Sequence, residues 1–106
     1  MAIDKILIVD DELLVRNFLA ETLRRKNLDV STAENGQKAI SMIKENSYDL
    51  VITDMKMPDL TGIDVLRKTK ELSPNTIVVV ITAFGSIENA VEAMRLGAFN
   101  YLIKPF

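Results

Sequence analysis

The sequence YDLVITDMKMPD, residues 48–59, contains an uninterrupted apolar run that ends abruptly in an acid. Residues 50–52 are Leu-Val-Ile, and Thr53 and Asp54 follow them directly. A short apolar run with such boundaries is typical of a strand that is buried on both faces, as in parallel sheets. Ligands of open parallel α/β sheets bind beyond the carboxyl ends of the strands. Asp54 is therefore a candidate functional carboxylate, although an acid at this position can also simply cap the next turn.

The rest of the chain alternates between predicted strands and predicted helices. Apolar, β-branched or alternating runs predict five strands, at residues 6–9, 30–33, 49–53, 76–81 and 100–103. Apolar residues at helical spacing predict four intervening helices with these residues facing inward: Val15, Phe18, Leu19, Thr22 and Leu23; Ala39, Ile40 and Ile43; Ile63 and Leu66; Ile87, Ala90, Val91 and Met94. Asn27 and Gly97 are placed to end the first and fourth helices in the left-handed conformation. This alternation predicts one α/β domain, with a parallel sheet and helices on both faces.

The composition excludes several classes of function. A chain of 106 residues with 48% hydrophobic and 26% charged residues is one ordinary globular domain. Its net charge of −2 does not favour direct nucleic-acid contact. The sequence has no cysteine and no histidine, so a metal ion would have to be held by oxygen, which favours Mg²⁺. No apolar run is long enough to span a membrane and no signal peptide is recognisable, so we expect a cytoplasmic protein without membrane contact.

Reactive side chains follow four of the five predicted strands. Asp10 and Asp11 follow the first strand, Asp54 the third, Thr82 the fourth and Lys104 the fifth. Two carboxylates ~5 Å apart repel each other by roughly 3 kcal/mol at an effective dielectric constant of 20, and a hard divalent cation removes that repulsion. A lysine can pair with a phosphoryl group, a threonine hydroxyl can donate to it, and an aspartate can accept it as a nucleophile. These residues together predict phosphoryl chemistry.

Each of these side chains also has an ordinary structural explanation. The acids at 10 and 11 can cap the first helix. Thr82 can be a strand residue or a helix cap, and Lys104 can be an exposed lysine on an edge strand. Each explanation is plausible for one residue alone. Their joint occurrence at strand ends favours a functional site.

Four motifs carry a resemblance to a known family. They are ILIVDDE at residues 6–12, DLVITDMKMPDLTG at 49–62, VVITA at 79–83 and YLIKPF at 101–106. In this order and spacing they resemble the receiver domain of two-component response regulators, over essentially the whole chain. Within that family, residues 54–66 and 82–106 are most similar to receivers of the NtrC type, which are attached to sigma-54-dependent activators.

The resemblance implies a fold and a metal site. The fold would be flavodoxin-like (CheY-like), with strand order 2-1-3-4-5. Asp54 would accept a phosphoryl group from a sensor histidine kinase. Mg²⁺ would contact Asp11, Asp54 and the backbone carbonyl of Lys56 directly, and Asp10 through a water molecule.

The resemblance also implies how the site responds to phosphorylation. Thr82 and Lys104 would contact the phosphoryl group, and the peptide bond between Lys104 and Pro105 would be cis. Tyr101 would be the switch aromatic, turning inward when Thr82 moves toward the phosphate. The alternative for Tyr101 is an ordinary half-exposed strand tyrosine.

We therefore expect a signalling module and not an enzyme with a separate substrate, since the domain would catalyse only its own phosphorylation and dephosphorylation. The expected partners are the kinase and an output domain in the same chain, for which AAA+ and DNA-binding domains are an option. A second copy of the chain, forming a homodimer, is a further optional partner. Two alternatives stay open, a pseudo-receiver that serves only as an interaction module and an aspartyl-phosphate hydrolase of the haloacid dehalogenase type. The hydrolase class needs an acid where this chain has Lys56. Pseudo-receivers usually lack a site residue, and none is missing here.

The family also carries a fifth helix after the Lys-Pro-Phe motif. We therefore expect residues 1–106 to form a receiver domain that is truncated before this helix. With three helices on one face of the sheet, the first helix alone would cover only about two strands of the other face. Apolar side chains of the strands predicted at 49–53 and 76–81 would then form an exposed patch.

Overall fold

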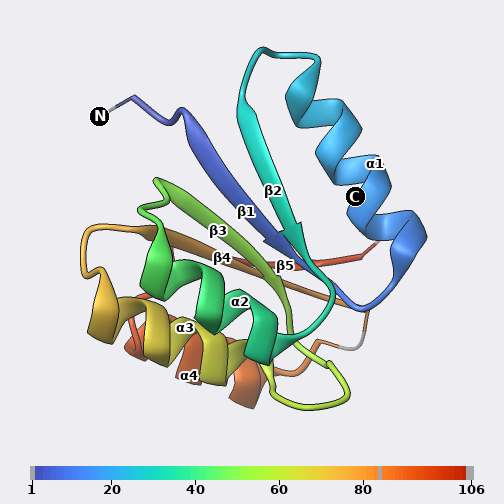
Figure 1. Ribbon diagram of the computed structural model, residues 1–106. Helices are drawn as coiled ribbons and strands as arrows, with labels where there is room; N and C mark the ends of the chain where they lie inside the picture. Colours follow the sequence, from blue (N-terminus) through green and yellow to red (C-terminus); the bar gives the residue numbers. More distant parts are fainter. Residues whose placement is uncertain (1, 84, 105–106) are drawn as a thin grey trace.

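The computed structural model describes residues 2–83 and 85–104. Five parallel strands form one sheet in the order β2-β1-β3-β4-β5 (Figure 1). The elements are β1 (Lys5–Val9), α1 (Leu13–Arg24), β2 (Asp29–Ala33), α2 (Gly36–Glu45), β3 (Leu50–Asp54), α3 (Gly62–Leu72), β4 (Ile77–Thr82), α4 (Ile87–Arg95) and β5 (Asn100–Ile103). The predicted α/β fold and strand order are confirmed, and no strand boundary differs from the prediction by more than one residue.

Helices cover both faces of the sheet. α2, α3 and α4 lie side by side on one face, and α1 lies on the other face against β1 and β2 (Figure 1). Within β1, Leu7 and Val9 belong to the core beneath α2 and α3, whereas Ile6 and Ile8 pack with Ala20 of α1. Because both faces of β1 are covered, its sequence is continuously apolar rather than alternating.

Capping side chains mark the start of α2 and α3, and residues in the left-handed conformation follow the ends of α1 and α4. Asn35 caps α2, and Thr61 and Asp64 form a capping box at the start of α3. Asn27 has a φ of 64° and Gly97 a φ of 99°, so both adopt the predicted left-handed conformation after their helices. Over residues 2–83 and 85–104, none of the helices has the length and apolar character needed to cross a membrane.

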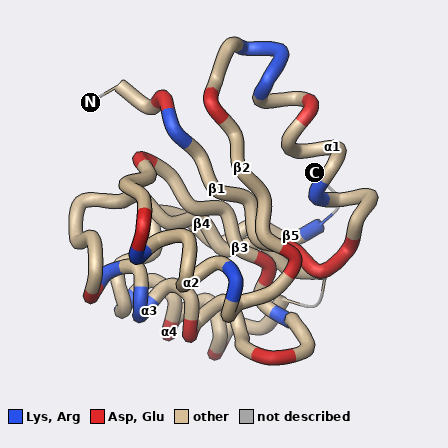
Figure 2. Tube along the Cα trace, viewed as in Figure 1, with Lys and Arg blue, Asp and Glu red and all other residues tan. Residues whose placement is uncertain are grey.

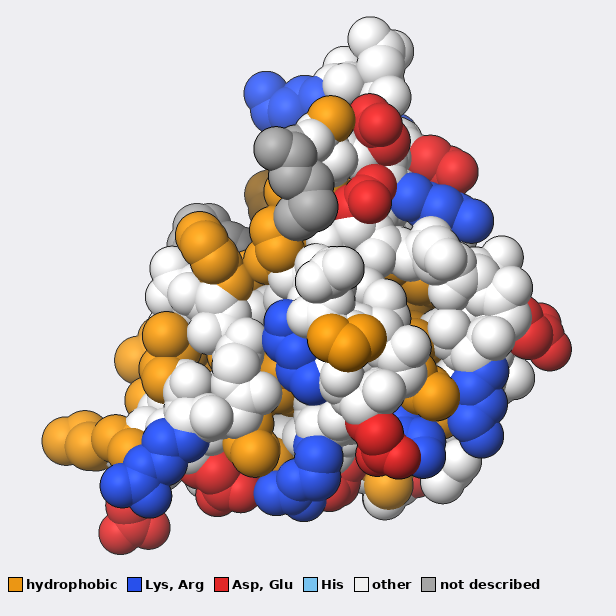
Figure 3. Space-filling view, turned by 90° about the vertical axis from the view of Figure 1, so that its left-hand side faces the viewer, with side chains coloured by type: hydrophobic (Ala, Val, Ile, Leu, Met, Phe, Trp, Pro, Cys, Tyr) orange, Lys and Arg blue, Asp and Glu red, His pale blue; other side chains and the backbone are white. Residues whose placement is uncertain are grey.

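The prediction for the inward face of α4 was wrong. Ile87 is 84% exposed, Val91 and Met94 are also exposed, and Ala93 is the residue buried against the sheet. Periodicity could not decide the orientation, because this helix carries apolar residues on both faces. The small side chain of Ala93 lets the helix approach the sheet closely, and the larger residues are left outside. Hydrophobic side chains are accordingly visible at the molecular surface (Figure 3).

The prediction that Phe18 faces inward was also wrong, because its side chain is 58% exposed. α1 contacts the sheet through a narrower arc, which leaves Phe18 outside the cluster that the helix forms with β1 and β2. On the same face of the sheet, Leu50 and Ile52 are only partly buried and Leu102 is exposed. The expected apolar patch is thus present in part, but Ile81, which was expected to contribute to it, is buried.

Candidate functional site

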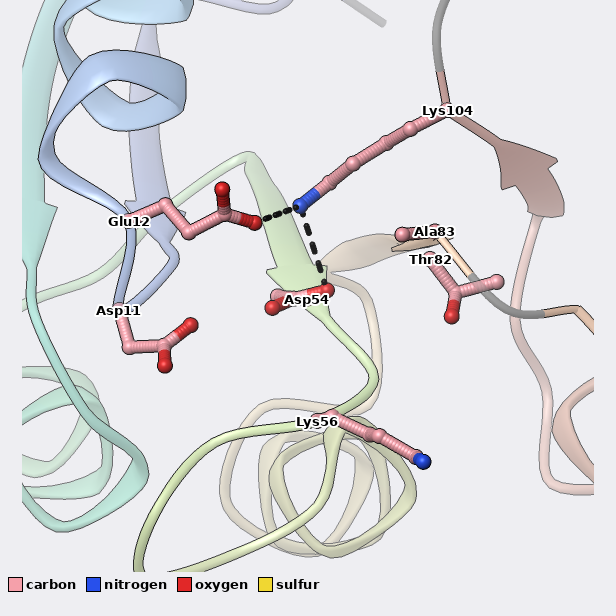
Figure 4. A pocket seen from close by; sticks show the side chains of 7 residues that line it. All are labelled: Asp11, Glu12, Asp54, Lys56, Thr82, Ala83 and Lys104. Carbon is pink, nitrogen blue, oxygen red and sulfur yellow. Dashed lines mark hydrogen bonds and ion pairs between the residues drawn. The ribbon is translucent and has the colours of Figure 1, made fainter.

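Asp54 lies at the centre of the carboxyl edge of the sheet. It is the last residue of the middle strand, β3, and only 5% of its surface is exposed. A pocket of about 230 Å³ opens beside it. The pocket is lined by residues from four separate parts of the chain, namely Asp11, Glu12, Asp54, Lys56, Thr82, Ala83 and Lys104 (Figure 4). The fold therefore brings the predicted strand-end residues together, as parallel strands require.

Lys104 crosses the pocket and pairs with three acids. Its Nζ lies 3.0 Å from Oδ2 of Asp10, 3.2 Å from Oε1 of Glu12 and 3.5 Å from Oδ1 of Asp54. Figure 4 shows the extended side chain pointing from the end of β5 toward Glu12 and Asp54. Burial acts to lower the pKa of Lys104, but the bond and charge of Asp10, with the charges of the other acids, outweigh it and raise the pKa. Lys104 is thus not the exposed edge-strand lysine that was weighed as an alternative.

The surroundings of Asp54 disfavour the ionised form of its carboxyl group. Burial raises its pKa to about 6 from 3.8, and the negative charges of Asp10 and Asp11 act in the same direction. The charge of Lys104 and the bond donated by the backbone N–H of Met55 oppose this rise without cancelling it. Burial and the neighbouring acids together therefore outweigh the stabilising effect of Lys104 on the ionised form of Asp54.

The three acids that follow β1 have different surroundings. Asp10 is fully buried, and its Oδ1 accepts the backbone N–H of Glu12 at 2.9 Å. Asp11 is exposed and directs its carboxylate toward the pocket (Figure 4). The N-cap of α1 is Glu12, without a side-chain capping bond, so neither Asp10 nor Asp11 is its N-cap. Figure 2 shows acidic positions gathered where β1 and β3 end, at one edge of the sheet.

Glu12 is a site residue that sequence reasoning missed. Oxygen atoms of Asp10, Glu12 and Asp54 all lie within 4.8 Å of one another, close enough to share one cation. The signal was the third acid of the ILIVDDE motif. That signal could not be interpreted alone, because Lys104, the partner of Glu12, is 92 residues away in the sequence.

Lys56 and Thr82 lie on the other side of Asp54 from Asp11 (Figure 4). Lys56 belongs to the loop between β3 and α3, and its ammonium group points away from Asp54. The prediction that the backbone carbonyl of Lys56 holds a cation stays a prediction. Thr82 ends β4, is buried, and accepts the backbone N–H of Lys104 on its carbonyl oxygen at 2.7 Å. It does not cap α4, whose N-cap is Ser86.

Tyr101 is half-buried and packs against the core beneath α2, α3 and α4. Its hydroxyl group is buried and has no hydrogen-bond partner among residues 2–83 and 85–104. This partial burial fits the switch aromatic and the ordinary half-exposed strand tyrosine alike, so the switch role stays a prediction. Pro105 lies outside the described residues, so the predicted cis peptide bond between Lys104 and Pro105 stays a prediction.

Comparison with known proteins identifies the family. The model of the family described as "Response regulator receiver domain" matches residues 6–106. The chain belongs to this family. The resemblance drawn from the sequence motifs is therefore confirmed, and the likeness of this receiver domain to the NtrC type agrees with its relatives PilR and AtoC and with one solved neighbour, the NtrC4 receiver domain.

Three similar proteins show the range of the match. The response regulator protein PilR of Pseudomonas aeruginosa is 41% identical over 105 residues, which are 99% of this chain and 24% of PilR. The beryllofluoride-activated NtrC4 receiver domain dimer is 37% identical with a TM-score of 0.90, covering 95% of this chain and 84% of that chain. A Burkholderia pseudomallei response regulator crystallised with a phosphorylated aspartic acid, a calcium ion and citrate is 28% identical with a TM-score of 0.92, covering 97% of this chain and 61% of that one. The receiver domain thus spans about a quarter of PilR.

The residues of this receiver domain fit a hard divalent cation. The pocket lining offers carboxylate oxygens near Asp54, and the sequence has no cysteine thiolate or histidine imidazole, the ligands that softer metals prefer. Burial is the main cause of the raised pKa of Asp54, and the charges of Asp10 and Asp11 raise it further because these acids repel the ionised Asp54. A bound cation would remove this repulsion, so the chemistry of the donors supports the predicted site.

Proposed function

We propose that this receiver domain accepts a phosphoryl group on Asp54 from a sensor histidine kinase and passes the resulting change of state to an output domain. The observation that carries the proposal is the position of Asp54, nearly buried at the mouth of the pocket and 3.5 Å from Lys104. An oxygen of the Asp54 carboxylate would attack phosphorus. The bond between phosphorus and the donor nitrogen would break, and an acyl phosphate would form.

Lys104 and Thr82 would support this transfer by different means. The ammonium group of Lys104 neutralises charge near Asp54. After transfer, it can pair with an oxygen of the phosphoryl group instead of with the free carboxylate. With a pKa of about 6, Asp54 is largely ionised at neutral pH and is available as a nucleophile. Thr82, at the end of the neighbouring strand, would donate its hydroxyl group to the phosphoryl group.

Mg²⁺ would be held by Asp11, Asp54 and the carbonyl of Lys56. Both carboxylate oxygens of Asp10 already accept bonds, from the N–H of Glu12 and the ammonium group of Lys104, which supports an indirect contact through water. When bound, the ion would supply positive charge between the acids and the phosphoryl oxygens. The calcium ion named with the phosphorylated Burkholderia regulator supports this part of the proposal.

The similar proteins support the proposed partners. PilR and the regulatory protein AtoC of Escherichia coli are about four times as long as this chain, which is consistent with an output domain beyond the receiver. AAA+ and DNA-binding domains are the proposed output, in line with the NtrC-like motifs. The NtrC4 receiver dimer supports homodimerisation as one route of signalling. A cytoplasmic location belongs to the same proposal, because the phosphodonor kinase would act there.

A small acyl phosphate donor added with Mg²⁺ tests the proposed function against its two alternatives. A stable adduct of one phosphoryl group per chain is the expected result. Turnover of foreign phosphoesters without a lasting adduct would instead favour the hydrolase, although Lys56 stands where that class needs an acid. No reaction, in a protein that still binds Mg²⁺, would favour the pseudo-receiver.

A further inference from the structure

Asp59 connects the loop between β3 and α3 to the start of α2, which is distant in the sequence. Its Oδ1 accepts the backbone N–H of Gly36 at 3.0 Å and that of Leu60 at 2.8 Å. Its Oδ2 accepts the N–H of Gln37 at 2.8 Å. Gly36 and Gln37 are the first two residues of α2, so a carboxylate from the loop between β3 and α3 caps a helix that precedes β3. This bonding uses two of the N–H groups that a helix leaves unpaired at its start.

The N-terminus of α2 stabilises Asp59 as an anion. Burial acts to raise the pKa of Asp59, but the N–H groups of Gln37, Gly36 and Leu60 lower it below its usual value. The partial positive charge at a helix N-terminus acts in the same direction. Asn35 caps the same helix separately, since its Oδ1 accepts the N–H of Lys38 at 2.8 Å.

The loop that Asp59 holds, residues 55–61, is the one that carries Lys56. The start of the loop is attached to the site, because the N–H of Met55 bonds to Oδ1 of Asp54 at 2.9 Å and to the carbonyl of Ile81 at 2.8 Å. Its end is attached to its start, because Gly62 donates to the carbonyl of Met55 at 2.8 Å. Both ends are thus fixed beside Asp54, and Asp59 lies in the intervening segment that reaches α2.

Packing at the same junction leaves little room for movement. A Cβ atom at Gly36 would lie 2.6 Å from Cβ of Leu60, so the loop and the helix start are in direct contact. A Cβ atom at Gly62 would lie 2.5 Å from the carbonyl oxygen of Asp54, so the end of the loop is equally close to the site. The backbone at Lys56 therefore lies between one attachment at the site and a second at α2.

We propose that Asp59 is a positioning residue that holds the loop between β3 and α3 against α2, keeps the backbone of Lys56, a residue of the pocket lining, beside Asp54, and thereby sets the affinity of the acid pocket for a divalent cation. This inference rests on the proposed function for its biological meaning, but it concerns a property of the unphosphorylated protein. Asp59 itself does not line the pocket and would touch neither the ion nor the phosphoryl group.

The test compares Asp59→Ala with Asn35→Ala. Both variants lose a cap at the start of α2, but only the first loses the bonds between the helix and the loop. Calorimetric titration with Mg²⁺ should show affinity roughly 10-fold weaker in Asp59→Ala, the size found for residues that orient metal ligands, and unchanged in Asn35→Ala. In the metal-free protein, the amides of Met55 and Gly62 should exchange hydrogen faster in Asp59→Ala alone. At saturating Mg²⁺, its labelling rate by an acyl phosphate should stay within about twofold of wild type, as expected when affinity alone is affected.

Equal Mg²⁺ affinity in wild type, Asp59→Ala and Asn35→Ala would overturn the proposal and leave Asp59 as a helix cap only. If Asp59→Ala does not fold, Asp59→Asn takes its place, because it keeps one acceptor oxygen. An affinity equal to that of wild type in Asp59→Asn, with faster exchange at Gly62, would likewise overturn it. Failure of the proposed function looks different: wild type would then resist phosphorylation while Asp59→Ala still bound Mg²⁺ more weakly.

Discussion

The ammonium nitrogen of Lys104 lies 3.5 Å from Oδ1 of Asp54, although β4 lies between the two strands whose ends carry them. Lys104 can reach Asp54 because its side chain extends along the carboxyl edge of the sheet and is only 12% exposed. The same nitrogen is closer to Asp10, at 3.0 Å. One cation is therefore shared among several acids, and Asp54 keeps a raised pKa despite it.

This raised pKa predicts how stability depends on pH. Asp54 has a pKa of about 6 in the folded chain, whereas its ordinary pKa, expected in the unfolded chain, is 3.8, so between these values the folded protein holds a proton that the unfolded chain has lost. The contribution of Asp54 to stability therefore falls as pH rises through this window, by up to about 3 kcal/mol. Asp54→Asn should remove this loss. In urea unfolding, the free energy of unfolding of the variant should therefore rise relative to that of wild type between about pH 4 and pH 7. A difference between the two proteins that does not change with pH would contradict the assignment.

Two exposed acids offer a direct test of the proposed metal ligands. Asp11→Ala should weaken Mg²⁺ binding more than Glu12→Ala, because Asp11 is a proposed ligand whereas Glu12 is paired with Lys104. Asp11→Ala should also stabilise the metal-free protein slightly, because the charge of Asp11 raises the pKa of Asp54. Calorimetric titration of both variants measures the first effect. Stronger weakening in Glu12→Ala would instead favour the cluster of Asp10, Glu12 and Asp54.

Thr82→Ala should still accept a phosphoryl group but should transmit the resulting conformational change poorly to α4 and β5. The proposed link runs from the Thr82 hydroxyl to Tyr101, whose buried hydroxyl group lacks a partner among the described residues and whose ring packs next to the start of α4. Such a link is a two-state element of the kind that switching requires. Nuclear magnetic resonance spectra of α4 and β5 should change on phosphorylation in wild type and in Thr82→Ser, which keeps the hydroxyl. Equal changes in Thr82→Ala would exclude the link.

The partly exposed apolar face beside α1 predicts an effect of chain length. An added helix of about 12–15 residues that covers Phe18 and Leu102 should raise the urea midpoint of the 106-residue chain, because an apolar patch is costly in water. Alternatively, the short chain hides the face by self-association, which sedimentation would detect. A polar extension of equal length is the control. Equal midpoints for all three proteins, with a monomeric short chain, would show that the face needs no cover.

The positions of the strands and the edge that carries the site could be predicted because both depend on local pattern. The apolar runs around Val51 and Val80 have the length and β-branched content of buried strands, and parallel strands place their carboxyl ends together. Asp54, Thr82 and Lys104 consequently met as expected. Predicting that these residues lie close together required only the direction of the strands and no distances.

Features that depend on the choice between two surfaces, or on contacts distant in sequence, could not be predicted. α4 has apolar residues on both faces, and only its packing shows that Ala93 faces inward while Ile87 faces solvent. Glu12 pairs with Lys104 across 92 residues, and Asp59 bonds to Gly36 across 23. Neither spacing has a sequence signature, because both pairs are made by the tertiary fold.

The most direct test of the central claim is to locate the phosphoryl group by mass spectrometry after treatment with an acyl phosphate donor and Mg²⁺. We expect one added phosphoryl group in wild type, mapped to Asp54, and none in Asp54→Asn. Asp64→Asn, which alters a partly buried capping acid outside the pocket lining, should label like wild type. Labelling of Asp54→Asn at the same rate as wild type, or a phosphoryl group mapped to another residue, would contradict the account.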